Sequence, residues 1–276
     1  MRIYKSDLND DEWKIIEPLL LEHYEPYQKF HSRERPIGGR IMTVDMRDVM
    51  DGIFYIITTG CQWEYIPRDF PAKGTVYSHY CKLKECGAWD KILEITNRSV
   101  REKEGRSKEP TLGLIDSQSV KTVYSGKDRG IDGNKKIKGR KRHIVVDIIG
   151  CLLGIYVHAA NISDTIAAEN VMIKSIERYG SLKAFCADEG YRGTAVAAAE
   201  KLGRPMQISK KILGENEDPK KWKTIPKRWV VERNFGWYGN YRRLSKDYEK
   251  NVDNSETMVK VCAIRINLRK LSKIQV

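Results

Sequence analysis

The chain has 276 residues and a formal net charge of +13, from 50 Lys and Arg against 37 Asp and Glu. Apolar runs are too short to span a membrane and the first residues lack the apolar core of a secretory signal, so we expect a cytoplasmic protein and no membrane partner. Six cysteines without a CxxC pair argue against a disulfide scaffold or a structural zinc site. The basic excess predicts a polyanionic partner, with nucleic acid ahead of a ribosomal or other anionic surface.

Residues 1–105 are predicted to be helical. Acids and cap residues precede a first helix near Trp13 that contains Pro18, and a polar loop follows at 24–40. Two helices are predicted at 44–59 and 73–86, with an ordered turn at 61–71 between them. This helix pair could be a helix-turn-helix or a purely structural hairpin. After one more helix, the charged segment 101–110 marks the predicted boundary between domains 1–105 and 106–276.

From residue 111 the pattern changes to strands. An apolar run ends at Asp116 and a long polar loop is expected after it; strands at 142–147 and 152–157 form a probable hairpin. Then follow a helix from about 161 to 179, a strand ending at Asp188, a helix at 193–201, a strand at 205–208, a helix from about 225 containing Glu232, and a last helix at 255–271. The order predicts a mixed sheet flanked by helices, intermediate between the α+β and α/β classes.

Three acids are candidates for one metal site. Asp116 and Asp188 each end an apolar strand, so they can lie on neighbouring strands, and Glu232 can reach them from a packed helix. Carboxylates that converge need a cation, and hard oxygen ligands suit Mg²⁺ or Mn²⁺. Two such ions would serve phosphodiester chemistry, for which a basic protein supplies the phosphate contacts.

Each acid also has a structural interpretation. Asp116 could cap a turn, Asp188 could end a strand, and Glu232 could be a solvated helix residue. Glu189 competes with Asp188, but strand alternation should turn it to the opposite face. Asp147 is interpreted as a hairpin residue and Asp164 as a helix cap.

Several motifs around these acids resemble a known family. Segments 115–121 (IDSQSVK), 187–191 (ADEGY), and 228–233 (RWVVER) followed by 241–248 (YRRLSKDY) resemble the three acidic motifs of bacterial insertion-sequence DDE transposases of the insertion-sequence-five group. Segments 60–67 (GCQWEYIP) and 75–77 (TVY) resemble the amino-terminal domain of that group. The resemblance covers nearly the whole chain.

The resemblance implies a ribonuclease-H-like catalytic core behind a helical DNA-binding domain. It implies metal-dependent DNA cleavage and strand transfer at terminal inverted repeats, with Asp116, Asp188 and Glu232 as catalytic metal ligands. It also assigns Arg228, four residues before Glu232 and therefore on the same helix face, to DNA binding. We expect DNA, both repeat and target, as the partner, and a homodimer or higher oligomer in the active complex.

The chain departs from the family signature at two positions. The signature has a tyrosine three residues before the arginine and a lysine seven residues after the glutamate, where this chain has Ile225 and Gly239. Arg242, Arg243 or Lys246 could provide the missing cation at the DNA end.

A basic run lies between the first two predicted strands. Eight cations fall between residues 127 and 142, and we expect a loop there to overhang the carboxylates and bind phosphate through Lys138, Arg140, Lys141 and Arg142. A solvated charged face is the alternative. His143 is expected to begin the next strand, and Trp229, which could stack on a base, is expected to lie in the core.

Three functions compete on this sequence. The leading hypothesis is a DNA transposase, the second is a DNA-binding regulator with an inactive core, and the third is a metal-dependent nuclease that cuts without joining. The complete acid set favours an enzyme over the regulator. The transposase-like amino-terminal region and end motif favour a transposase over the nuclease.

Overall fold

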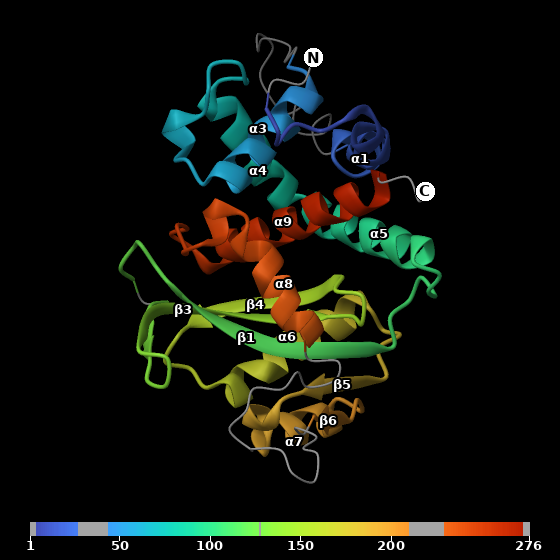
Figure 1. Ribbon diagram of the computed structural model, residues 1–276, viewed down its shortest axis with the longest axis vertical. Coiled ribbons are helices and arrows are strands. Elements are labelled where there is room, and N and C mark those ends of the chain that lie inside the picture. The colour runs from blue at the N-terminus through green and yellow to red at the C-terminus, as the bar shows by residue number, and fades with distance from the viewer. Residues whose placement is uncertain (1–3, 27–43, 127, 210–228, 273–276) are drawn as a thin grey trace, which may run out of the picture.

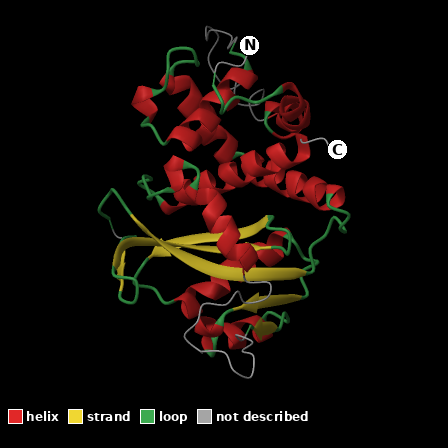
Figure 2. Cartoon of the chain, viewed as in Figure 1, coloured by secondary structure: helices red, strands yellow, loops and turns green. Residues whose placement is uncertain are grey.

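The structure, a computed structural model, describes residues 4–26, 44–126, 128–209 and 229–272. Helices fill the amino-terminal part and flank a sheet in the remainder (Figure 2). The α-helices are α1 (Asp10–His23), α3 (Met46–Thr59), α4 (Lys73–Glu85), α5 (Ala88–Lys103), α6 (Asp164–Arg178), α7 (Thr194–Lys201), α8 (Trp229–Gly239) and α9 (Val252–Ser272). The 3-10 helices are η1 (Trp63–Tyr65), η2 (Glu189–Tyr191) and η3 (Arg242–Leu244). The strands are β1 (Leu112–Lys121), β2 (Gly130–Asp132), β3 (Ile137–Val146), β4 (Leu152–Ala159), β5 (Ala184–Ala187) and β6 (Met206–Ile208).

Local signals set the ends of the amino-terminal helices. Asn9 and Glu12 form a reciprocal capping box at the start of α1, which continues through Pro18. Gly60 ends α3 with φ of 69°, a left-handed conformation that favours glycine. A Cβ on Gly60 would lie 2.9 Å from the carbonyl carbon of Arg242. Glycine therefore both ends α3 and lets the η3 segment approach it closely.

The sheet is mixed, as expected. Its strand order is β2-β3-β1-β5-β6, with β4 also paired to β3. β1 is antiparallel to β3 from Leu114↔Val146 to Lys121↔Gly139, and it is parallel to β5. The prediction that a loop begins after Asp116 is wrong, because β3 provides a hydrogen-bonding partner for five further residues of β1.

Side-chain alternation divides the core between the two faces of the sheet. Leu114 and Ile144 belong to the cluster on the face covered by α8 and α9. Ile115 and Val145 belong to the cluster on the face covered by α6 and α7. Figure 1 shows α8 crossing one face of the sheet and α6 lying on the other. A mixed sheet flanked by helices is thus confirmed.

The amino-terminal helices and the carboxyl-terminal helix share one core. In Figure 1, α9 lies between the amino-terminal helices and the sheet, and it packs on α1, α3 and α5 as well as on β4. Arg265 of α9 forms a buried ion pair with Glu12 of α1 at 2.6 Å. The division at residue 105 remains a prediction about function, whereas the packing of the two regions is continuous.

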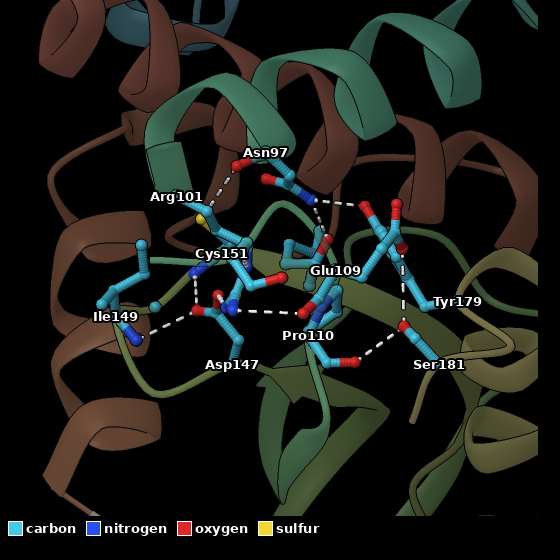
Figure 3. Close-up of polar contacts among 12 residues, drawn as sticks. Asn97, Arg101, Glu109, Pro110, Asp147, Ile149, Cys151, Tyr179 and Ser181 are labelled. Atoms are coloured by element: carbon cyan, nitrogen blue, oxygen red, sulfur yellow. Dashed lines mark hydrogen bonds and ion pairs between the residues drawn. The ribbon is translucent and has the colours of Figure 1, made fainter. Parts of the chain in front are cut away.

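A buried polar cluster joins α5 to the β3–β4 hairpin (Figure 3). The Asp147 carboxylate accepts a hydrogen bond from the Cys151 backbone N–H at 2.8 Å and forms an ion pair with Arg101 of α5. One turn earlier on α5, the Asn97 side-chain amide donates to the Tyr179 hydroxyl at 3.0 Å. The predicted hairpin role of Asp147 is confirmed, and the same carboxylate also holds α5 on the sheet.

Candidate active site

The parallel register of β1 and β5 leads towards two of the predicted acids, each of which lies two residues beyond the last paired position. In this parallel pair Leu114 lies opposite Cys186, and all three paired positions differ by the same 72 residues. Asp116 and Asp188 also differ by 72, two positions beyond that pair, and the backbone of Asp188 is still extended, with φ of −83° and ψ of −179°. Asp116 lies within β1 and has the parity of Leu114, so it faces the α8 side of the sheet, whereas Asp188 lies just beyond the end of β5.

The charges of both acids act on one buried side chain. Burial raises the pKa of the Tyr191 hydroxyl well above its usual value, and the negative charges of Asp116, Asp164 and Asp188 raise it further. The Asp188 carboxylate also accepts a hydrogen bond from the Gly190 backbone N–H at 2.9 Å, which holds the turn after β5 against it. The charges of three carboxylates, from β1, from α6 and from the turn after β5, therefore act on one buried tyrosine.

Glu232 lies on the helix that covers the same face. Val230 and Val231 are buried against the core, whereas Glu232 is exposed in the first turn of α8, which packs on β1 and β3. Among the described residues, no three His, Cys, Asp or Glu side chains are close enough together to hold one metal ion. Two carboxylates in register still fit a hard divalent cation by chemistry, and Glu232 is the acid of α8 positioned over that face.

The argument that strand alternation turns Glu189 away from these acids does not apply in the structure. β5 ends at Ala187, so strand alternation does not apply to Glu189, which begins the 3-10 helix η2. Its exposed carboxylate forms an ion pair with Arg192 at 2.6 Å.

The sequence did not predict a buried chain of hydrogen bonds that lies behind the acids. His158 Nδ1 lies 3.0 Å from the Ala159 carbonyl oxygen and must donate to it, so His158 Nε2 accepts from His143 Nδ1 at 3.4 Å. His143 Nε2 then accepts from the Tyr191 hydroxyl at 2.6 Å. Burial lowers the pKa of His143 to about 3, which keeps the ring neutral. His143 lies in the middle of β3 rather than at its beginning.

The prediction that Asp164 caps a helix is wrong, because the N-cap of α6 is Ser163. Asp164 is the first residue of α6, and its carboxylate accepts from the Ser117 hydroxyl at 2.9 Å and pairs with Lys141 at 3.1 Å. Ser117 is the residue after Asp116, so this pair fixes β1 next to the candidate ligand. Residues 116–119 are all polar, so no alternation in the sequence marked this contact.

The basic run is not the exposed loop that was expected. Arg140, Lys141 and Arg142 lie within β3, each no more than 6% exposed, whereas Lys138 is exposed. The Arg140 guanidinium pairs with buried Asp247 at 3.1 Å. A buried guanidinium must be paired, so these buried cationic groups stabilise the fold and are not exposed to DNA phosphates.

Two arginines of β3 and η3 hold the segment that follows α8. Arg142 donates to the carbonyl oxygens of Leu244 at 2.6 Å and Lys246 at 3.1 Å. Arg243 is buried and pairs with Glu249 at 2.7 Å, which argues against a role in DNA contact.

Two other candidate DNA-binding cations are exposed to solvent. Arg242 and Lys246 are exposed, and Gly239 ends α8. Arg228 and Ile225 lie outside the described residues.

Trp229 is not a core residue. Its side chain is 44% exposed, and the Arg233 guanidinium carbon lies 4.4 Å from its ring centroid and 4.5 Å from that of Trp237. This cation–aromatic stack runs along α8 beside Glu232. The expectation of burial failed because the outer side of the first turn of α8 faces solvent.

Comparison with known proteins identifies the class of this chain. Residues 107–268, more than half of the chain, match the family described as "Transposase DDE domain", so the protein belongs to that family. Residues 8–93 match a second family, "Putative transposase of IS4/5 family". The chain is thus an insertion-sequence transposase of the DDE type, and its mixed sheet is consistent with the ribonuclease-H-like core expected.

A relative from Burkholderia cepacia agrees with this assignment. The "Insertion element IS402 uncharacterized 16.2 kDa protein" is 28% identical over 132 residues, which are 46% of this chain and 80% of the relative. Within the described part of the chain, no helix has the length and apolar character needed to cross a membrane.

Proposed function

We propose that the protein cuts and joins DNA at the ends of its insertion sequence, after binding the terminal inverted repeats. The observation that carries this proposal is the parallel pairing of β1 with β5, which ends two residues before both Asp116 and Asp188, on a sheet whose α8-covered face lies under the helix that bears Glu232. These three acids are the proposed catalytic residues.

The proposed cofactor is Mg²⁺ or Mn²⁺, bound as two ions. Asp116, Asp188 and Glu232 would hold them, since carboxylate oxygens are the ligands that these cations prefer. Bound there, the ions would stabilise the charge that develops on the attacking and leaving oxygens of the phosphodiester. The protein contributes position: Asp164 of α6 holds Ser117, the residue after Asp116, and His143 of β3 holds Tyr191, three residues after Asp188.

DNA contact is proposed for the exposed cations. Lys138, Arg242 and Lys246 are exposed near segments that buried arginines hold in place, and Arg228 remains a candidate from the family signature. Base recognition is proposed for the α3–α4 helix pair, whose existence the structure confirms. We place the protein at the bacterial nucleoid because its substrate is chromosomal DNA, and we propose that two or more copies assemble on a pair of DNA ends.

Labelled DNA from the flanks of the gene tests the reaction. Incubation with and without Mg²⁺ should give metal-dependent cleavage followed by joined products. Cleavage without joining would favour a nuclease, and specific binding without cleavage would favour a regulator.

Acid variants test the site. Asp116→Asn, Asp188→Asn and Glu232→Gln should each abolish cleavage and joining while leaving DNA binding intact, because each keeps the side-chain shape and removes one negative charge. Double variants should be no worse than single ones. Glu189→Gln is the matched control, since its carboxylate already pairs with Arg192, and it should retain most activity. Substantial cleavage by any of the three variants would contradict the assigned site.

A further inference from the structure

A cavity lined by aromatic and cationic side chains lies away from the carboxylates. Its volume is about 380 Å³, within the range of small-molecule and base-binding sites. Four aromatic rings line it, from Trp63, Tyr77, Tyr124 and Tyr248. They come from η1, from α4, from the loop after β1 and from the segment between η3 and α9, so only the folded chain assembles the cavity.

Hydrogen bonds to the backbone hold the segments that form the walls of the cavity. The Val123 N–H donates to the Asp247 carbonyl oxygen at 3.0 Å, and the Asp247 N–H donates to that of Lys121 at 2.8 Å, which brings Tyr124 beside Tyr248. Arg243, buried and paired with Glu249, donates to the Cys61 carbonyl oxygen at 3.2 Å and so holds the turn before Trp63.

The rings remain accessible. Tyr77 is 40% exposed and Tyr124 is 47% exposed, and the Trp63 ring contacts Tyr77 edge-on with centroids 5.1 Å apart. Aromatic rings on the wall of an open cavity provide stacking faces for a planar ring. Core packing alone does not require tyrosines at these exposed positions.

The charge of the lining favours an anionic ligand. Both acids are neutralised, Glu64 by Lys73 and Glu249 by Arg243. Lys250 is the further cation, with its ammonium 5.6 Å from the Tyr124 ring centroid. Planar stacking faces beside a cation match a nucleotide, whose base can stack while its phosphate remains near the ammonium.

The cavity is separate from the candidate active site. Tyr124 follows Asp116 by eight residues along β1 and its continuation, which corresponds to roughly 25 Å of extended chain. At about 3.4 Å per nucleotide, this distance corresponds to some seven nucleotides of one DNA strand.

We infer that this cavity binds one unpaired base of the DNA, displaced from the helical stack at a distance from the bond that is cut. The inference rests on the proposed DNA-binding function. The base stacks between Tyr77 and Tyr124, and Lys250 contacts the adjoining phosphate. The protein therefore prefers DNA that already contains an extrahelical base, because it does not have to unstack one.

Fluorescence titration tests this inference. The probes are a random-sequence duplex of about three helical turns with one unpaired 2-aminopurine, and the same duplex with that base paired. The full-length protein should bind the bulged duplex about 5- to 150-fold tighter, the range that stacking of one base supplies, and should quench its fluorescence. Tyr124→Ala should lose the preference and the quenching, so that it binds the two duplexes with equal affinity.

Two further variants control for folding and for nonspecific aromatic contact. Tyr124→Phe keeps the ring and should keep the preference. Tyr65→Ala removes a tyrosine that is 72% exposed but does not line the cavity, and it should change nothing. Equal affinity of the unaltered protein for both duplexes, or a preference that persists in Tyr124→Ala, would overturn the inference. Failure to bind either duplex would instead count against the proposed DNA-binding function.

Discussion

Arg140 is expected to stabilise the fold rather than to bind DNA. Its side chain is 4% exposed and pairs with Asp247, whose side chain is fully buried, and it also donates to two backbone carbonyl oxygens, of Glu249 at 2.9 Å and Lys250 at 2.8 Å. Removing one partner of a buried pair costs about 3–5 kcal/mol, because the other charge stays buried alone. Arg140→Ala should therefore lower the free energy of unfolding by about that amount and the melting temperature by roughly 6–10 °C.

Thermal and urea unfolding measure this loss, and Lys138→Ala is the matched control. Lys138 is an exposed cation two residues earlier on the same strand, and its removal should change the unfolding free energy by no more than about 0.5 kcal/mol. Changing Asp247 to Ala together with Arg140 should recover part of the loss, since no unpaired carboxylate remains. The reasoning is refuted if Arg140→Ala melts like the unaltered protein while weakening the salt dependence of DNA binding.

Two further predictions concern salt and pH. Affinity for DNA should fall steeply with salt. Changing Lys138, Arg242 and Lys246 together to Ala should flatten the slope of log affinity against log salt by about 0.9 for each phosphate that the protein no longer neutralises. An unchanged slope in gel-shift titrations would remove these cations from the DNA-binding surface. Burial lowers the pKa of His143 from its usual 6.5 to about 3, so below pH 6.5 the unfolded chain binds a proton that the folded chain does not. The unfolding free energy should therefore decrease as the pH falls from 6.5 towards 3, by up to about 1.4 kcal/mol per pH unit from this residue. His143→Gln should make that decrease shallower in urea unfolding, and equal slopes would contradict the assignment.

Local patterns in the sequence determined the identity and order of most elements. Apolar runs, caps and glycines mark β4, β5, α6 and α9 close to their observed bounds, because periodicity and capping depend on neighbouring residues. The apolar runs that precede Asp116 and Asp188 were also recognisable in the sequence, and they form the paired strands β1 and β5. The family resemblance rests on the same local motifs.

Only the tertiary structure decided where the charges lie. The run 135–143 has the composition of a solvated loop, yet β3 pairs along β1 and carries Arg140 and Arg142 into the core. Their partners, Asp247 and the carbonyl oxygens of the 244–250 segment, are about a hundred residues away in the sequence. A charged side chain is buried where distant groups neutralise it, so its burial depends on long-range packing and cannot be read from neighbouring residues.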